Sequence, residues 1–186
     1  MSARDGKFQQ AEERLTVTLA QTGDAQAFHR LVEMYDQRLY YFIRRIIGDA
    51  DAAFDVLQAV WLQVHRKIRS LSSPGAFRVW IYRIAHNRAV SELRRMNRGP
   101  ISVEQIETEV AETSDENESF DHAELVHRAL QNLSIDHQRV LTLRFLEEMS
   151  VEEIADVIDG NPGTVKSRLH YAKKALRDRI KELLDE

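Results

Sequence analysis

The chain has 186 residues, of which 43% are hydrophobic and 30% charged, a composition typical of a globular protein with one ordinary domain or two small ones. No stretch approaches the roughly 18 consecutive apolar residues of a membrane-spanning helix. The N-terminus has no apolar signal core either, so we expect a cytoplasmic protein without membrane insertion. The absence of cysteine excludes disulfides, thiolate catalysis and cysteine-based zinc sites.

Charge is sorted along the chain, although the net charge is only −4. Basic residues dominate the segment 66–98, in which Glu92 is the single acid. No Lys or Arg occurs between Arg98 and Arg128, where acidic residues are frequent, and the segment 166–181 is basic again. Two basic segments separated by an acidic one indicate two modules that bind nucleic acid.

Apolar residues recur at helical spacing through the first half of the chain. We expect a short helix over residues 9–21, followed by a long amphipathic helix that Asp24 caps and Gly48 ends. A second apolar stripe, which includes Phe54, predicts another helix over residues 51–68.

A Ser-Ser-Pro-Gly break precedes the third long helix. Ser73 is placed to cap a helix that begins at Pro74 and runs to about Met96. These helices predict one helical domain over residues 23–98, preceded by an N-terminal extension over residues 1–22.

The second half of the chain begins with residues 99–121, which are acidic, polar and weakly periodic and therefore predict a flexible linker. A second domain over residues 122–186 follows, and no strand pattern competes with its helical periodicity. Its predicted helices span residues 122–132, 135–147, 151–158 and 162–184. The predicted fold class is all-α, with two small helical domains joined by an acidic flexible linker.

The most specific local signal is a helix-turn-helix in the C-terminal domain. Ser150 and Glu153 have the spacing of a capping box at the start of its first helix. Gly160 suits a left-handed cap at the end of that helix, and Asn161 is placed to cap the next one. In this motif the second helix enters the DNA major groove; an ordinary αα-hairpin is the alternative. The second helix would present to DNA the side chains of Asn161, Thr164, Lys166, Ser167, Arg168, His170, Tyr171 and Lys174.

The order of the parts resembles the extracytoplasmic-function (ECF) sigma factors of bacterial RNA polymerase, in the sigma-70 superfamily. The resemblance covers nearly all of residues 23–180. It implies a sigma region 2-like domain over residues 23–98 and a region 4-like domain over residues 122–186. It rests on three stretches in the family's order: GDAQAFHRLVEMYDQRLYYFIRRIIGDADAAFDVLQAVWLQVHRKI, FRVWIYRIAHNRAVSELRR and NLSIDHQRVLTLRFLEEMSVEEIADVIDGNPGTVKSRLHYAKKAL.

The resemblance implies roles for particular residues. Docking on core RNA polymerase would involve Asp55, Gln58, Leu57 and Trp61, although Leu57 and Trp61 are equally consistent with core packing. The loop Arg69–Gly75 would form part of a pocket for a flipped base, and the helix-turn-helix would read the minus-thirty-five element. The residues implied in binding the minus-ten element are Lys67, Arg69, Phe77, Arg78, Tyr82, Arg83, Asn87, Arg88, Arg94 and Arg95.

The sequence departs from the usual family pattern at several positions, among them Trp61, where phenylalanine is usual. An acidic residue is usual where Ala59 stands, and an aspartate where Ser91 stands. Leu-Pro is usual where the chain has Leu133-Ser134, and an arginine where it has Tyr171. Tyr171 bears on promoter sequence, because tyrosine cannot make the bidentate guanine contact of arginine.

Catalytic motifs are absent from the sequence. The histidines are scattered, and neither a phosphate-binding P-loop nor a Rossmann glycine pattern occurs, so we expect no enzyme activity, cofactor or metal. The leading hypothesis is a sigma factor that binds core RNA polymerase and directs promoter recognition and transcription initiation, with an anti-sigma factor as a further partner. The alternatives are a stand-alone helix-turn-helix regulator and a sigma-derived adaptor that does not initiate.

Overall fold

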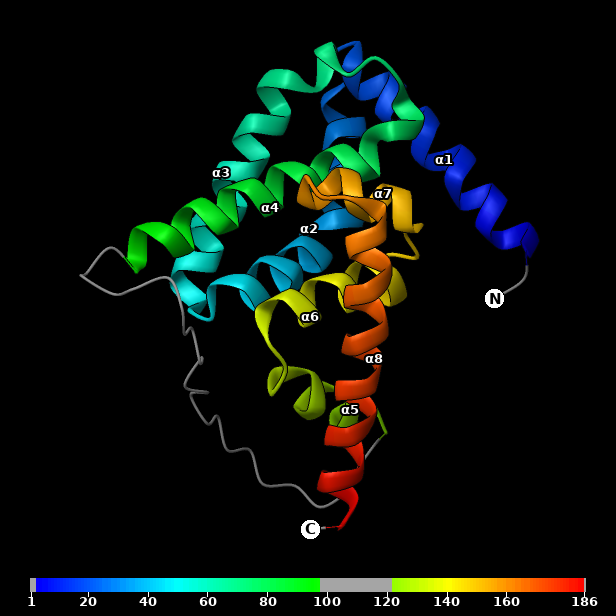
Figure 1. Ribbon diagram of the computed structural model, residues 1–186. Helices are drawn as coiled ribbons and strands as arrows, with labels where there is room; N and C mark the ends of the chain where they lie inside the picture. Colours follow the sequence, from blue (N-terminus) through cyan, green and yellow to red (C-terminus); the bar gives the residue numbers. More distant parts are fainter. Residues whose placement is uncertain (1–2, 98–121, 186) are drawn as a thin grey trace. The chain divides into compact units, whose positions relative to one another are not determined.

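A computed structural model describes residues 3–97 and 122–185 (Figure 1). The chain divides into two compact units, one ending at Met96 and the other beginning at Asn97. The predicted linker over residues 99–121 lies outside the described residues. Within the described ranges, no helix is both long enough and apolar enough to cross a membrane.

The first unit is built around α2, which packs against α1, α3 and α4 (Figure 1). Two short 3-10 turns, η1 and η2, connect α3 to α4. Aromatic rings join the helices in the core, where Tyr35 meets Phe77 edge-on at 5.5 Å and Phe42 meets Tyr82 at 5.3 Å between ring centroids. The elements are α1 (Ala3–Gln21), α2 (Ala25–Ile47), α3 (Ala50–Lys67), η1 (Ile68–Ser70), η2 (Pro74–Ala76) and α4 (Phe77–Met96).

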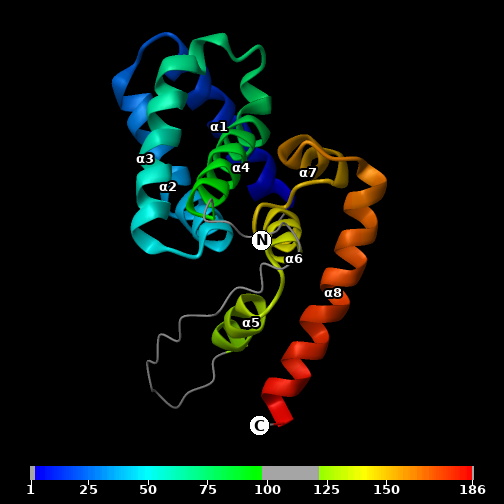
Figure 2. The same ribbon diagram turned by 60° about the vertical axis from the view of Figure 1, so that its left-hand side comes forward.

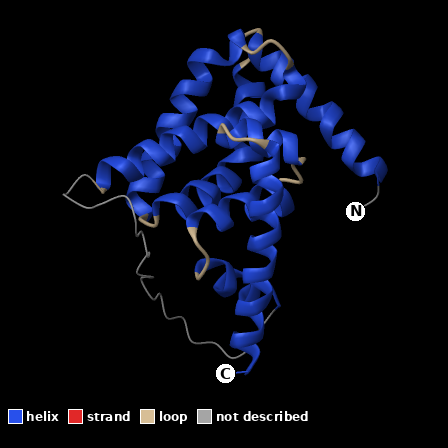
Figure 3. Cartoon of the chain, viewed as in Figure 1, coloured by secondary structure: helices blue, strands red, loops and turns tan. Residues whose placement is uncertain are grey.

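The second unit is organised along the long helix α8, which packs against α5, α6 and α7 (Figure 2). A π-helical turn, η3, continues α6, so the helix predicted over residues 135–147 is present but changes its hydrogen-bond pattern after Leu141. The elements are α5 (His122–Gln131), α6 (Ile135–Leu141), η3 (Thr142–Leu146), α7 (Val151–Ile158) and α8 (Pro162–Asp185). No strand occurs in residues 3–97 or 122–185, and the all-α prediction is confirmed (Figure 3).

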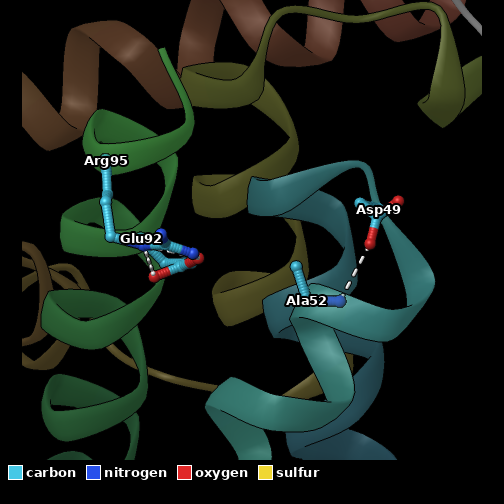
Figure 4. A network of polar contacts seen from close by, with 4 residues as sticks. All are labelled: Asp49, Ala52, Glu92 and Arg95. Carbon is cyan, nitrogen blue, oxygen red and sulfur yellow. Dashed lines mark hydrogen bonds and ion pairs between the residues drawn. The ribbon is translucent and has the colours of Figure 1, made fainter. Parts of the chain in front are cut away.

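Local capping defines the helix ends of the first unit. Asp24 Oδ1 accepts hydrogen bonds from the backbone N–H of Gln26 and Ala27, and Gly48 ends α2 in the left-handed conformation at φ 81°. Both predicted ends of α2 are confirmed. Asp49 Oδ1 accepts from the Ala52 N–H at 2.8 Å and so caps α3 (Figure 4).

The capping box of the second unit is also confirmed. The Glu153 N–H donates to Ser150 Oγ at 3.1 Å, and the Ser150 N–H donates to Glu153 Oε2 at 2.8 Å. The left-handed cap, however, is Asp159 at φ 53°, so its assignment to Gly160 was wrong by one residue. Aspartate tolerates this conformation because its short polar side chain can bond locally. Asn161 Oδ1 accepts from the Gly163 N–H at 2.7 Å and caps α8 as predicted.

Three predictions about the first unit need correction. Helix α1 extends back to Ala3 instead of beginning near residue 9. Ser73 forms no capping hydrogen bond, and Pro74–Ala76 is a 3-10 turn, so α4 begins only at Phe77. Phe54 is half exposed instead of lying on the inner stripe of α3, because α2 and α4 cover a different side of that helix.

Candidate protein and nucleic-acid interfaces

The outer face of α3 combines acidic, amide and apolar side chains. Asp51, Asp55, Gln58 and Leu62 are exposed and follow one another at steps of four, three and four residues, which places them on one side of the helix. Leu62 is 59% exposed, and the exposed ring of Phe54 lies on the flank of this face. Exposed apolar side chains beside carboxylates suit a protein partner with a basic surface.

The other two residues predicted for polymerase docking belong to the packing of α3. Leu57 is only 3% exposed and is a core residue, which favours the core-packing alternative over a direct polymerase contact. Trp61 is half-buried, and its Nε1–H donates to Asp36 Oδ1 of α2 at 2.8 Å. Leu62 was missed, although it lies four residues after Gln58 on the same helical face.

A second exposed face lies on α4 and is basic. Arg83, Asn87 and Arg94 are exposed and separated by four and seven residues, so they occupy one side of the helix. Ser91 lies on the same side and adds no negative charge. A cationic stripe with one amide is suited to phosphates and a base edge.

Some other residues predicted for the minus-ten site form hydrogen bonds within the first unit or are partly covered by it. Arg95 Nε donates to Glu92 Oε2 at 2.9 Å (Figure 4), and this hydrogen bond lowers the pKa of the Glu92 carboxyl. Arg88 Nε donates to Gln63 Oε1 of α3 at 2.8 Å, and Arg78 is half-buried. Lys67 is exposed at the end of α3, and Arg69 is exposed in the loop that leads to α4.

Two aromatic residues predicted to contact DNA are core residues. Phe77 and Tyr82 have no exposed surface, since each ring packs edge-on against an aromatic ring of α2. Their burial leaves neither ring accessible to DNA in this structure, so the basic side chains of α4 are the better candidates for strand contacts. Asn87 is the remaining predicted base contact on this helix and is exposed.

The N-terminal half of α8 presents most of its predicted DNA residues to solvent. Val165, Leu169 and Ala172 are buried, and they orient the helix so that its polar side faces outward. The Ser167 hydroxyl donates to the Thr164 carbonyl at 3.0 Å, so its oxygen is left to accept. The exposed predicted residues are Asn161, Thr164, Lys166, Ser167, His170, Tyr171 and Lys174.

Arg168 differs from its neighbours on α8. Its Nη2 lies 3.1 Å from Asp136 Oδ2 of α6, and its side chain is largely covered. Asp136 also forms an ion pair with Arg139, whose pKa burial and the charge of Arg168 lower to about 10. Arg139 is therefore still a cation at neutral pH, and one carboxylate serves two guanidinium groups.

The second unit also contains an apolar groove of about 400 Å³ that sequence analysis missed. Phe145 and Leu146 of the π-helical turn line it and remain more than half exposed, whereas Lys173 and Arg177 lie at its edge. Periodicity predicts a regular helix here and so gives no signal for these side chains. The lining suits apolar side chains of a protein better than nucleic acid. The remaining lining residues are Val126, Leu130, Leu141, Thr142, Leu176, Ile180 and Lys181.

Possible metal ligands are scattered over the described part of the chain. Among its His, Asp and Glu side chains, no three are grouped so that they could hold a metal ion. The features that stand out there are surfaces for macromolecules.

Comparison with known structures supports the fold. The sigma factor RpoE in complex with the anti-sigma factor NepR from Bartonella quintana superposes with a TM-score of 0.64 at 20% identity, covering 84% of this chain and 98% of that one. CnrH in complex with the cytosolic domain of CnrY gives a TM-score of 0.62 at 21% identity, covering 93% and 97%.

Sequence comparison shows the family. Residues 31–99 match Sigma-70 region 2, and residues 123–176 match Sigma-70, region 4. The ECF RNA polymerase sigma-E factor of Escherichia coli K12 is 31% identical over 95% of this chain and 98% of its own length. The factor of the same name from Haemophilus influenzae is 33% identical over 95% and 99%. The chain therefore belongs to the extracytoplasmic-function sigma factors of RNA polymerase, which direct promoter-specific transcription initiation.

Proposed function

We propose that the chain binds core RNA polymerase through α3, holds the melted minus-ten strand along α4 and reads the minus-thirty-five element with α8. The observation that carries this proposal is the pair of basic exposed faces, one on α4 and one on the N-terminal half of α8, in a single chain. A regulator that reads one duplex site needs one such face. The proposed role is that of a cytoplasmic regulatory subunit rather than an enzyme.

The proposed polymerase contact is the outer face of α3. Asp55 and Gln58 are exposed at its centre, and Leu62 adds a large apolar side chain. An interface that places a carboxylate and an amide beside a large apolar side chain would gain specificity from charge complementarity with a basic partner helix. Ala59 is half-buried, so the acidic residue usual in the family at this position would point less directly to the partner than Asp55 does.

The proposed minus-ten contacts are the exposed residues Arg83, Asn87 and Arg94 of α4, with Lys67 at the end of α3 and Arg69 in the loop. A separated strand offers phosphates to the cations and unstacked bases to amide and loop groups. The loop over residues 69–75 is proposed to receive a flipped base. Phe77 and Tyr82 have no direct part in this proposal, because they hold α4 against α2.

The proposed minus-thirty-five contacts are the exposed residues of α8 near its N-terminus. Lys166 and Ser167 lie in the first turns, where a helix that enters the major groove contacts base edges. Tyr171 is largely exposed and meets His170 edge-on at 5.4 Å between ring centroids. We propose that Tyr171 makes a hydroxyl or apolar contact with DNA in place of the guanidinium contact usual in the family.

An anti-sigma factor is a further proposed partner. Two structurally similar proteins were solved with a bound partner, CnrH with the cytosolic domain of CnrY and the sigma factor RpoE with the anti-sigma factor NepR. The exposed Leu62 and Phe54 beside Asp55 would give such a protein an apolar surface to cover. Binding there would block the proposed polymerase contact directly.

The experiment that tests this function is run-off transcription with purified core polymerase on fragmented genomic DNA, with and without the protein. We expect new, discrete start sites that share paired upstream elements. Polymerase binding without initiation would indicate an adaptor instead. Absence of polymerase binding, together with sequence-specific duplex binding, would indicate a stand-alone regulator.

A further inference from the structure

The C-terminal end of α1 holds the loop between α3 and α4. Gln21 Nε2 donates hydrogen bonds to two backbone carbonyls of this loop, that of Ile68 at 3.0 Å and that of Leu71 at 2.7 Å. These partners are 47 and 50 residues away in the sequence. Both N–H groups of the Gln21 side-chain amide therefore donate to the loop backbone.

The two bonds reach the loop at the point where its backbone leaves the helical conformation. The Leu71 N–H closes a 3-10 turn onto the Ile68 carbonyl, after which Leu71 leaves the helical conformation at ψ 118°. A carbonyl that leaves the helical ladder near the protein interior needs another donor. Gln21 supplies such a donor to the Leu71 carbonyl at 2.7 Å.

Two arginines lie against glycine backbones around the same loop. A Cβ added at Gly75 would lie 3.1 Å from Arg14 Nε and 3.4 Å from its Cζ, so the Arg14 guanidinium covers the backbone there. A Cβ added at Gly23 would lie 3.1 Å from Arg69 Nη2. Arg14 and Arg69 are both exposed, and the loop residues between η1 and η2 are exposed or half-buried. The loop is thus flanked by two cations, one of which comes from α1.

We propose that α1 is a working part of the minus-ten site. Gln21 is a positioning residue that shapes the loop over residues 68–76 around an unstacked base, and Arg14 is an additional phosphate contact. This inference rests on the proposed function of the loop. It gives a role to the N-terminal helix, which the sequence had indicated only as an extension of the first domain. A side chain that fixes backbone carbonyls would affect which base fits, whereas a cation at the rim would affect all bases equally.

The test uses the full chain bound to core polymerase and a labelled single-stranded oligonucleotide. Its sequence is the non-template strand of a minus-ten element found by run-off transcription, with each position changed in turn to the other bases. We expect Gln21→Leu to reduce discrimination at one position by about tenfold, a loss typical of one base contact, with an unchanged salt dependence. Gln10→Leu is the matched control, because Gln10 is exposed on the same helix.

Arg14→Gln tests the second half of the proposal. We expect weaker binding of every oligonucleotide and a slope of log affinity against log salt that is shallower by about 0.7, as for one lost contact with a single-stranded phosphate. Gly75→Ala should change the salt slope in the same direction but by less, since the added methyl group would lie 3.1 Å from Arg14 Nε and would shift the guanidinium without removing its charge. If Gln21→Leu fails to fold, Gly75→Ala still tests whether the contact between α1 and the loop affects strand binding.

Two results would overturn the inference in distinguishable ways. If folded Gln21→Leu discriminates among bases as the wild type does, and neither Arg14→Gln nor Gly75→Ala alters the salt slope, then α1 has no part in strand binding although the minus-ten site stands. If the wild type itself shows no base preference on these oligonucleotides, the proposed minus-ten site is wrong and this inference falls with it.

Discussion

Arg168 Nη2 of α8 lies 3.1 Å from Asp136 Oδ2 at the start of α6. The other carboxylate oxygen of Asp136 binds Arg139, which is mostly covered by neighbouring residues. One carboxylate therefore links the DNA-reading helix to the helix that supports it. It also removes Arg168 from the set of cations available to DNA.

Asp136→Asn should destabilise the second unit by about 1–3 kcal/mol, because it removes the ion pair that Asp136 forms with the largely buried Arg139 guanidinium. Thermal or urea unfolding measures this loss. Asp178→Asn is the control, since its ion pair with Arg177 is long and solvent-exposed, and a change below about 0.5 kcal/mol is expected there. The same Asp136 variant should bind duplex DNA with a steeper salt dependence, because Arg168 is released. Equal stability of the two variants would contradict the linking role of Asp136.

The double variant Asp55→Arg, Gln58→Ala should weaken binding to core polymerase while leaving duplex binding by the full chain unchanged. Both side chains are exposed on α3, so their replacement removes partner contacts without opening the core. Affinity for purified core polymerase, measured by fluorescence anisotropy, is the readout. Unchanged polymerase affinity would place the docking surface elsewhere.

Two leucines of α3, Leu57 and Leu62, allow the effect of core packing to be distinguished from the effect of polymerase contact. Leu57→Ala should lower stability by about 2–5 kcal/mol, as expected for a buried leucine. Leu62→Ala should leave the unfolding midpoint nearly unchanged and reduce affinity for core polymerase, since Leu62 is 59% exposed. Calorimetry and a polymerase-binding assay on both variants measure these effects. A large loss of stability in Leu62→Ala would mean that the Leu62 side chain is packed against other residues in solution.

Lys166→Ala should cost about 1–3 kcal/mol of binding to the minus-thirty-five element and relax sequence preference at one position, if Lys166 reads a base. Competition binding against duplexes altered at single base pairs measures this. Lys173→Ala is a suitable control, because Lys173 lies at the edge of the apolar groove farther along α8. A uniform loss on all duplexes, with a salt slope shallower by about 1, would instead make Lys166 a phosphate contact.

The stability of the second unit should depend on pH through His137. Burial, and then the positive charge of Arg168, lower the pKa of its imidazole below the usual value of about 6.5. Below that value the unfolded chain takes up a proton that the folded chain resists. The free energy of unfolding should therefore fall as pH drops through about 6.5 towards the folded-state pKa, and then level off. His137→Gln should show a shallower dependence in urea titrations between about pH 7.5 and 5, and identical curves would exclude this contribution.

Much of the fold could be predicted because its signals are local. Asp24, Ser150 and Asn161 cap helices through backbone groups two or three residues away, so sequence spacing alone identifies them. The exposed residues of α8 were predicted for the same reason, since the buried Val165 and Leu169 orient that helix. Both Asp159 and Gly160 can adopt the left-handed conformation that ends a helix. The prediction chose Gly160, whereas the residue in this conformation is Asp159.

Periodicity, capping residues and the distribution of Lys and Arg are enough to predict a helical chain, most of its helix ends and its positively charged segments. Which apolar side chains are covered depends on how the helices pack, so that Leu57 is buried and Leu62, about one and a half turns away, is exposed. The packing also brings Gln21 to Leu71 and Arg168 to Asp136. The physical reason is that helical periodicity defines a face but not the neighbour that covers it, and polar pairs far apart in sequence form only once the helices have packed.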